Sequence, residues 1–333
     1  MKPYLYLPGL KKLVKKLRGN EKVHFGIRPY GFHGGNILSI IVYPYLLCKE
    51  FEKRGKGAKF NFTVSINDYE QDELDGPDIR KYPFNVYPKN TSLEFTKSEC
   101  NCHKYVADHW QPIIVKCFKN VVLKNFPNVS LTPVRNSELK IKSYFKELLI
   151  ETIKNPIKQS KIFAKYSGHQ VLNTPIKYAG VICPKCKSAH GDTSVEGKKV
   201  LWICRKCGFE DGGLYENFNY WWYHKAMLIA RLKIFKTEIA MSGGDHYSEG
   251  DYGVRRAFMK KYFKNFKEPV MLFCPTLLAL NGQKMSKSRK NTCFVDIKKL
   301  VDICESKSDS TIQVDKDLIA GLNEKEYFGN FNL

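Results

Sequence analysis

A strand, a glycine-bearing loop, a helix and a second strand follow one another between residues 22 and 66, and this order restricts the fold most. Residues 22–27 are predicted to form a buried strand and residues 36–54 a helix that Pro44 should kink. Residues 60–66 alternate apolar and polar side chains, the period of two typical of a strand. A strand, helix and strand at this spacing form a right-handed crossover, so a parallel sheet is expected.

Size and charge limit the class of protein. The chain has 333 residues, of which 43% are hydrophobic, enough for a sizeable core in two domains or in one domain with an insertion. Lysine and arginine number 55 against 33 acidic residues, and the net charge of +22 favours a polyanionic partner, nucleic acid before membrane. The alternative is a lysine-rich surface without a partner.

No membrane segment or secretion signal is expected. The longest apolar run, residues 37–48, is too short to span a bilayer and contains a proline. Residues 1–20 are basic and have no long apolar segment after the charges, so they predict a basic amphipathic helix rather than a signal peptide.

Four of the eleven cysteines form two Cys-x-x-Cys pairs, and this usage indicates a metal site rather than a disulfide framework. Seventeen residues separate the pairs, and two such turns can close a tetrahedral site of four thiolates. We therefore predict structural zinc at Cys183, Cys186, Cys204 and Cys207. Reduced thiols indicate the cytoplasm. The basic surface of this small unit is a candidate RNA contact.

Further elements are predicted from periodicity and from proline and glycine positions. Residues 72–90 should be loop, and residues 238–241 and 269–274 strands. Helices are expected over residues 102–125, 136–163 (broken by Pro156), 219–235 (with an aromatic start) and 251–263, and the tail from residue 294 is helix-like. The aromatic group at residues 220–223 is expected to pack in the core rather than to stack on a base.

Three short polar motifs carry the candidate chemistry. Residues 284–288, Lys-Met-Ser-Lys-Ser, place two lysines and two hydroxyls on a loop suited to hold triphosphate oxygens. Residues 33–36, His-Gly-Gly-Asn, precede a helix, where free N–H groups and the helix dipole attract phosphate. Residues 243–246, Gly-Gly-Asp-His, end a strand, the place where open parallel sheets bind ligands. The plain alternatives are a solvated basic loop and two structural turns.

In this order the three motifs resemble those of class I aminoacyl-tRNA synthetases, and residues 284–288 match the lysine-serine loop of that class without alteration. Over roughly residues 20 to 300 the chain is most similar to the catalytic part of class I lysyl-tRNA synthetases. Besides the motifs and the four cysteines, the similarity is carried by Gly26-Ile27 with Pro29, Asn67-Asp68-Tyr69, and Arg231 before Gly244-Asp245-His246.

The resemblance implies a Rossmann-like parallel-sheet catalytic domain with a helical, zinc-ribbon-containing insertion. It also implies that ATP with Mg²⁺ activates an amino acid as its adenylate, which is then transferred to tRNA or another RNA acceptor. The catalytic residues it implies are His33, Asn36, Lys284 and Lys287. The ATP-binding residues are Gly34, Gly35, Gly244, Asp245, Met285, Ser286 and Ser288. The amino-acid-binding residues are Gly26, Arg28, Asp68, His224 and His246.

The chain departs from the family pattern at several points. The interval from Pro29 to His33 is one residue short, Arg28 replaces a small polar residue, and Met227 replaces a carboxylate. A pocket with Arg28 and without that carboxylate is expected to disfavour lysine and to accept an acidic or neutral side chain. Only some forty residues follow the lysine-serine loop, so no anticodon-binding region is expected.

Three functions stay open on these grounds. The chain could charge tRNA, transfer a non-lysine amino acid to another acceptor (a modified RNA, a small molecule or a protein), or only bind RNA or nucleotide. The expected units are a basic N-terminal helix (1–20), two halves of the catalytic domain (21–135 and 237–300), an insertion with the zinc ribbon (136–236) and a short helical C-terminal segment (301–333).

Overall fold

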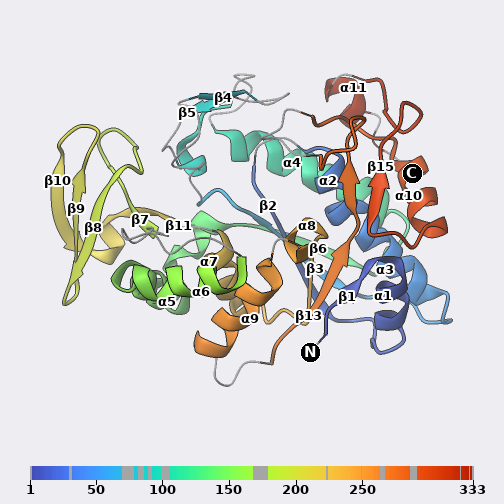
Figure 1. Cartoon of the computed structure of the whole chain (residues 1–333), viewed down its shortest axis with the longest axis horizontal. Coiled ribbons are helices and arrows are strands. Elements are labelled where there is room, and N and C mark those ends of the chain that lie inside the picture. The colour runs from blue at the N-terminus through green and yellow to red at the C-terminus, as the bar shows by residue number, and fades with distance from the viewer. Residues whose placement is uncertain are drawn as a thin grey trace.

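A computed structural model describes most of the chain (Figure 1). The described residues are 2–29, 32–69, 79–81, 86–88, 92–98, 105–167, 179–222, 224–248, 250–262, 267–285, 291–322, 324–329 and 331. Among the helices of these ranges, none combines the length and the hydropathy that a bilayer-crossing segment requires.

Six parallel strands form the central sheet in the order β1-β13-β12-β2-β3-β6. Their bounds are Tyr4–Leu5 (β1), Val270–Cys274 (β13), Ile239–Gly243 (β12), Lys22–Ile27 (β2), Asn61–Ile66 (β3) and Ser130–Arg135 (β6). The chain runs outward from β2 to β3 and β6, then returns beside β2 as β12 and continues to β13. This parallel α/β sheet confirms the predicted fold class, and the strand order reverses between β2 and β12.

Helices cover both faces of the sheet (Figure 1). Successive side chains of a strand point to opposite faces, and β2 follows this rule: Val23 and Phe25 belong to one core cluster, while His24 is buried on the other face. The first cluster lies under α1 (Tyr6–Val14), α3 (Tyr43–Glu52), α4 (Val106–Phe118) and α10 (Ile297–Ser306). The second lies under α5 (Ser143–Lys154), α7 (His224–Ile234) and α9 (Asp251–Tyr262), with α6 (Pro156–Ser167) beside α9.

The predicted helix over residues 36–54 is observed as three consecutive helical segments. These are α2 (Gly34–Ile37), a π-helical turn η1 (Leu38–Val42) and α3. The Tyr43 N–H donates to the Leu38 carbonyl, five residues back, directly before Pro44. Since proline has no N–H and its ring crowds the preceding turn, the wider π turn accommodates Pro44 without ending the helix.

Three predictions of local structure are wrong. Residues 219–222 form a strand, β11 (Asn219–Trp222), because they pair antiparallel with β7 (Ala179–Ile182); the aromatic side chains are buried, but in a sheet. The expected loop 72–90 contains paired strands β4 (Ile79–Lys81) and β5 (Val86–Pro88). The C-terminal tail contains β15 (Thr311–Gln313), which pairs with β14 (Thr276–Leu278). In each case a long-range or hairpin partner supplies hydrogen bonds that periodicity does not reveal.

The cysteine pairs lie at the base of a three-stranded antiparallel sheet, at one end of the molecule in Figure 1. Its strands are β8 (Gly191–Glu196), β9 (Lys199–Cys204) and β10 (Glu210–Leu214). The remaining elements are η2 (Leu93–Phe95), η3 (Lys119–Leu123), η4 (Asn136–Ile141), η5 (Tyr215–Asn217), α8 (Asp245–Ser248) and α11 (Glu324–Gly329). The boundaries proposed for the sequence units remain a prediction.

Candidate active site and metal site

The strands β2 and β12 are not paired with each other at their carboxyl ends. The two strands pair over only two residues, the last being Ala240 with His24. By contrast, β12 stays paired with β13 as far as Gly243, and β2 with β3 as far as Ile27. Because the strand order reverses between β2 and β12, this is the edge at which an open α/β sheet binds its ligand.

His33 and the glycines after it begin the helix that follows β2. His33 is buried, and its Nδ1 accepts a hydrogen bond from the Gly35 N–H at 3.2 Å, so the imidazole caps α2. Asn36 lies in the first turn, and within the described residues its buried amide oxygen has no hydrogen-bond partner. An unsatisfied polar group at a helix N-terminus suits a polar ligand such as a nucleotide.

The lysine-serine loop begins as the second arm of a hairpin. The chain turns back at Gly282, whose φ is +73°, and Met285 then pairs with β14 by donating its N–H to the Leu277 carbonyl at 2.8 Å. Beyond the loop, Asn291 Nδ2 donates to the Lys284 carbonyl at 3.1 Å, which ties its two ends together. Three of the predicted site residues lie outside the described residues: Ser286, Lys287 and Ser288.

The described parts of the three motifs meet at the carboxyl edge. A Cβ added to Gly34 would lie 3.2 Å from Met285 Sδ, so Gly34 packs against the start of the lysine-serine loop. The Lys284 ammonium forms an ion pair with the Asp245 carboxylate, Nζ to Oδ2 at 2.8 Å. Segments more than two hundred residues apart in sequence thus form one site.

The turn after β12 allows close backbone contact and holds a charged carboxylate. A Cβ on Gly244 would lie 2.6 Å from the Cys274 carbonyl oxygen, so only glycine fits there. Burial raises the pKa of Asp245, but the positive charges of His246 and Lys284 outweigh this, and the pKa is lowered overall. Asp245 is therefore ionised at neutral pH and anchors Lys284.

Next to this edge, a buried polar group lies beneath Gly26. A Cβ there would lie 3.3 Å from Arg231 Nη1 and 3.4 Å from Asn67 Oδ1. The Asn67 oxygen accepts hydrogen bonds from Arg231 Nη1 and, at 2.9 Å, from Asn136 Nδ2. Arg28, half-buried, directly follows β2. A guanidinium buried beside an exposed glycine gives this part of the site a positive charge.

Two acidic side chains lie on the β3 side of the site. Asp68 is buried and accepts hydrogen bonds from Ser137 N at 3.0 Å and Ser137 Oγ at 2.6 Å. Burial raises the pKa of Asp68 to about 6, although the Ser137 hydrogen bonds oppose the shift. Burial and then the charge of Asp68 raise the pKa of Glu94 to about 7. Glu94 Oε2 is buried with no hydrogen-bond partner among the described residues.

The other predicted amino-acid-binding residues come from α7 and α8. His224 begins α7, and its side chain lies outside the described part of the structure. His246 is half-buried in α8. Met227 is completely buried in the second core cluster, so the position where the resemblance expects a carboxylate is part of the hydrophobic core.

The four predicted zinc ligands are brought together. Their Sγ atoms all lie within 4.8 Å of one another, with Cys183 to Cys207 at 3.7 Å and Cys186 to Cys204 at 3.6 Å. Four thiolates bound tetrahedrally at zinc–sulfur distances of about 2.3 Å would lie about 3.8 Å apart. The donor set and its spacing therefore fit a structural zinc ion, which would close the site and fold the ribbon around it.

Both cysteine turns have the same backbone geometry. Lys187 N–H donates to the Cys183 carbonyl at 2.9 Å, and Gly208 N–H donates to the Cys204 carbonyl at 3.0 Å. Both donor residues have positive φ, +59° at Lys187 and +69° at Gly208. Such a conformation is favourable for glycine and costs about 1 kcal/mol for lysine. The two turns thus present their thiols in the same manner.

The sequence matches the model of the family described as tRNA synthetases class I (K) over residues 10–315. Because the match covers most of the chain, the protein belongs to this family. The membership confirms the predicted class, that of class I aminoacyl-tRNA synthetase catalytic domains. No curated protein matches the chain significantly in sequence.

Several solved structures of synthetases are similar to this chain. The tyrosyl-tRNA synthetase of Archaeoglobus fulgidus, complexed with L-tyrosine, is 13% identical with a TM-score of 0.43, over 86% of this chain and 64% of that one. That of Aeropyrum pernix is 15% identical with a TM-score of 0.43, over 86% and 62%. The tryptophanyl-tRNA synthetase of Campylobacter jejuni is 15% identical with a TM-score of 0.39, over 94% and 78%. The chain thus spans less than two thirds of the first two.

Sequence reasoning missed two features of the site. Glu94 was not a candidate, because it follows a stretch that was expected to be loop and no pattern marks it. Arg231 contributed only to the resemblance, whereas its burial beside Asn67 and Gly26 makes it part of the site's framework. A lone arginine in a helix gives no signal of burial in the sequence.

Proposed function

We propose that the protein activates an amino acid with ATP and transfers the resulting aminoacyl group to tRNA. The observation that carries this proposal is the meeting of three motifs at one edge of the sheet, through Gly34 with Met285 and Lys284 with Asp245. Each motif alone has a plain structural explanation. Their contact at the carboxyl edge favours a common ligand with phosphate groups and a polar sugar.

In the proposed reaction, the amino-acid carboxylate attacks the α-phosphorus of ATP. The bond from that phosphorus to the oxygen bridging to the β-phosphate breaks, and pyrophosphate leaves. His33 and Asn36, at the start of α2, would bind phosphate oxygens, with Mg²⁺ accompanying ATP. Lys284 and Lys287 would stabilise the charge that develops on pyrophosphate.

Further ATP contacts are proposed around this centre. Gly35 and Gly244 permit close approach of the nucleotide to the backbone. Asp245 would accept a hydrogen bond from a ribose hydroxyl. The remaining proposed contacts are Met285, Ser286 and Ser288.

For the amino acid we propose lysine. Glu94 supports this choice, because its buried oxygen has no hydrogen-bond partner among the described residues, and because burial and then the nearby Asp68 charge raise the Glu94 pKa. A substrate ammonium would satisfy both charges. Gly26, His224 and His246 would line the remainder of the pocket. The second candidate is an acidic or neutral amino acid, which Arg28 and the core position of Met227 favour.

Amino-acid-dependent exchange of labelled pyrophosphate into ATP, measured with each standard amino acid, tests activation and specificity together. We expect exchange with lysine; exchange with an acidic or a neutral amino acid but not with lysine would assign the pocket to the second candidate. Absence of exchange with every amino acid, with and without total tRNA, would refute activation. Charging of total tRNA then tests the acceptor.

Two matched pairs of variants test the assigned roles. Lys284→Ala should lower exchange by about a hundredfold or more, since it removes a cation that stabilises developing charge, and Lys284→Arg should retain part of it. His33→Ala removes a ligand and a helix cap, whereas His33→Asn retains a capping side chain. Full exchange by His33→Asn would show that His33 is only a cap.

We also propose a metal, a cellular compartment and an RNA contact for the four-cysteine ribbon. The four-cysteine site fits structural zinc in the reducing cytoplasm. The ribbon's basic side chains are proposed RNA contacts, although Arg205 forms an ion pair with Asp192 at 2.8 Å and Lys187 donates to the Pro184 carbonyl at 2.9 Å. The ion pair neutralises Arg205, whereas Lys187 keeps its charge, because a carbonyl is a neutral acceptor.

A further inference from the structure

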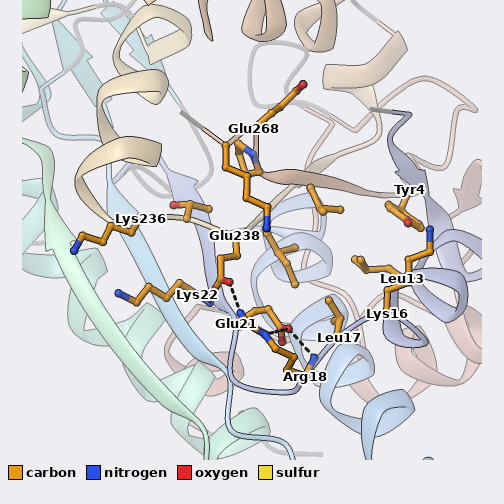
Figure 2. A pocket seen from close by; sticks show the side chains of 15 residues that line it. Tyr4, Leu13, Lys16, Leu17, Arg18, Glu21, Lys22, Lys236, Glu238 and Glu268 are labelled. Atoms are coloured by element: carbon orange, nitrogen blue, oxygen red, sulfur yellow. Dashed lines mark hydrogen bonds and ion pairs between the residues drawn. The ribbon is translucent and has the colours of Figure 1, made fainter. Parts of the chain in front are cut away.

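A hollow of about 860 Å³ lies at the amino edge of the sheet, opposite the candidate active site (Figure 2). It is lined by the first residues of three strands: Lys22 of β2, Ile239 of β12 and Val270 of β13. The last turn of α1 contributes Leu13, and the segment directly after the helix contributes Lys16 and Leu17. Since the carboxyl ends of the same strands carry the motifs, the hollow is separate from the nucleotide site.

The carboxylates around the hollow already have partners. Glu21 accepts hydrogen bonds from the N–H groups of Arg18 at 2.7 Å and Gly19 at 2.9 Å. Glu238 accepts from Arg18 Nη2 at 2.5 Å and from the Lys22 N–H at 3.0 Å. Glu268 pairs with Arg256 at 2.8 Å, a residue that does not line the hollow.

The lysines around the hollow are not neutralised. Four of them line it (Lys16, Lys22, Lys236 and Lys267), and among the described residues none forms an ion pair with a carboxylate. In Figure 2, Lys22 and Lys236 extend on one side, and Lys16 lies with Tyr4 on the other. The hydroxyl of Thr237, a buried residue of the lining, has no hydrogen-bond partner in the described part of the chain.

Lys236 occupies an unfavourable backbone position. It follows α7 with a φ of +50°, while its N–H donates to Lys233 and the Thr237 N–H donates to Leu232. This is the helix-ending turn in which glycine is preferred at the left-handed position. A lysine at this φ costs about 1 kcal/mol of folding free energy. Replacing it with glycine therefore removes the charge without disturbing the turn.

We propose that this hollow binds the phosphodiester backbone of an RNA. Its ammonium groups come from four separate segments and are spread around an open, partly apolar floor, whereas a single phosphate would be held by converging donors. Spread cations suit successive phosphates, and counterion release would drive binding. If the RNA is the tRNA of the proposed function, it would contact both edges of the sheet.

The test compares two triple variants in binding labelled total tRNA over a range of salt concentrations. Lys22→Ala, Lys236→Gly and Lys267→Ala remove three charges from the hollow, and glycine suits the φ of residue 236. The control removes three exposed lysines of the C-terminal segment, as Lys298→Ala, Lys307→Ala and Lys316→Ala. The unfolding midpoints of both variants verify that they fold.

The hollow variant should bind the RNA at least tenfold more weakly than the wild type. The slope of log K against log salt should become less steep by about 2 to 3, because each of the three lost phosphate contacts contributes about 0.7 to 0.9 to that slope. The control should change affinity by less than threefold. Equal losses in the two variants, or an unchanged slope, would overturn the proposal. Competition with pyrophosphate at constant ionic strength gives a second test. If pyrophosphate displaces the RNA from the wild type but not from the hollow variant, the hollow binds a free phosphate compound and the proposal is overturned.

Pyrophosphate exchange separates this proposal from the proposed function. Both triple variants should exchange as the wild type does, because the hollow is at the edge away from the nucleotide. A wild type without exchange would refute amino-acid activation, yet the RNA titration would still decide the role of the hollow.

Discussion

The pKa of Glu94 makes the stability of the protein depend on pH in a direction that can be calculated. Burial and then the Asp68 charge raise the pKa of Glu94 from its usual 4.5 to about 7. The folded state therefore binds this proton more tightly than the unfolded state does. The contribution to stability is present below the unfolded value and is lost as pH rises through the folded one.

Replacing the group isolates this contribution. A shift of about 2.5 pKa units corresponds to about 3 kcal/mol as an upper limit, and solvent access to the half-buried side chain reduces it to about 1 to 2 kcal/mol. Glu94→Gln keeps the shape without the charge. The free energy of unfolding of the wild type minus that of Glu94→Gln should fall by this amount between about pH 4.5 and pH 7, and stay level above it.

Denaturant unfolding at several pH values measures the difference directly. Glu210→Gln is the matched control, because Glu210 is exposed on β10 and the same charge is removed. For the control, the difference should remain within about 0.5 kcal/mol at every pH. If the Glu94→Gln difference is equally flat, or rises with pH, then Glu94 is not a buried carboxylate next to Asp68, and the reasoning about the pocket fails with it.

Three further predictions follow from the site. Gly34→Ala should cost about 1 to 3 kcal/mol of unfolding free energy and lower pyrophosphate exchange, because its Cβ would crowd the side chains of Leu277, Val295 and Met285; wild-type stability and exchange would contradict this close packing. Cys204→Ser should lose the proposed zinc, measured by metal analysis of the purified protein beside the wild type, and expose the ribbon to proteolysis; equal zinc contents in the two proteins would refute the ligand set. Lys187→Gly should raise the ribbon's resistance to proteolysis, because the stability gain at positive φ is about 1 kcal/mol; an unchanged digestion rate would contradict the strain.

Local patterns predict much of the central sheet. The strands at residues 22–27 and 60–66 follow from their periodicity, and the cysteine spacing predicts the four-sulfur cluster, because in each case the signal is contained in neighbouring residues. The strand at residues 219–222 could not be predicted in this way. Its aromatic side chains fit a buried helix equally well, and only pairing with β7 selects the strand.

The candidate site also contains residues that local sequence patterns predict and residues that they do not. His33 to Asn36 and the start of the lysine-serine loop were found because each motif is contiguous in sequence. Glu94 and Arg231 were not, because their roles depend on burial and on partners from other segments. A charged side chain inside a protein has a large energetic effect, but the sequence does not mark it as buried.

The two edges of the sheet differ for a physical reason that bears on function. At the carboxyl edge, Gly34 and Gly244 bring backbone close to neighbouring atoms, which suits a small ligand held at short range. At the amino edge, Lys22, Lys236 and Lys267 surround an open hollow, which suits a long polyanion held by charge. Adenylate formation needs the first kind of contact, since developing charge must be stabilised at fixed distances. Holding an RNA acceptor needs the second, so salt should weaken RNA binding much more than pyrophosphate exchange.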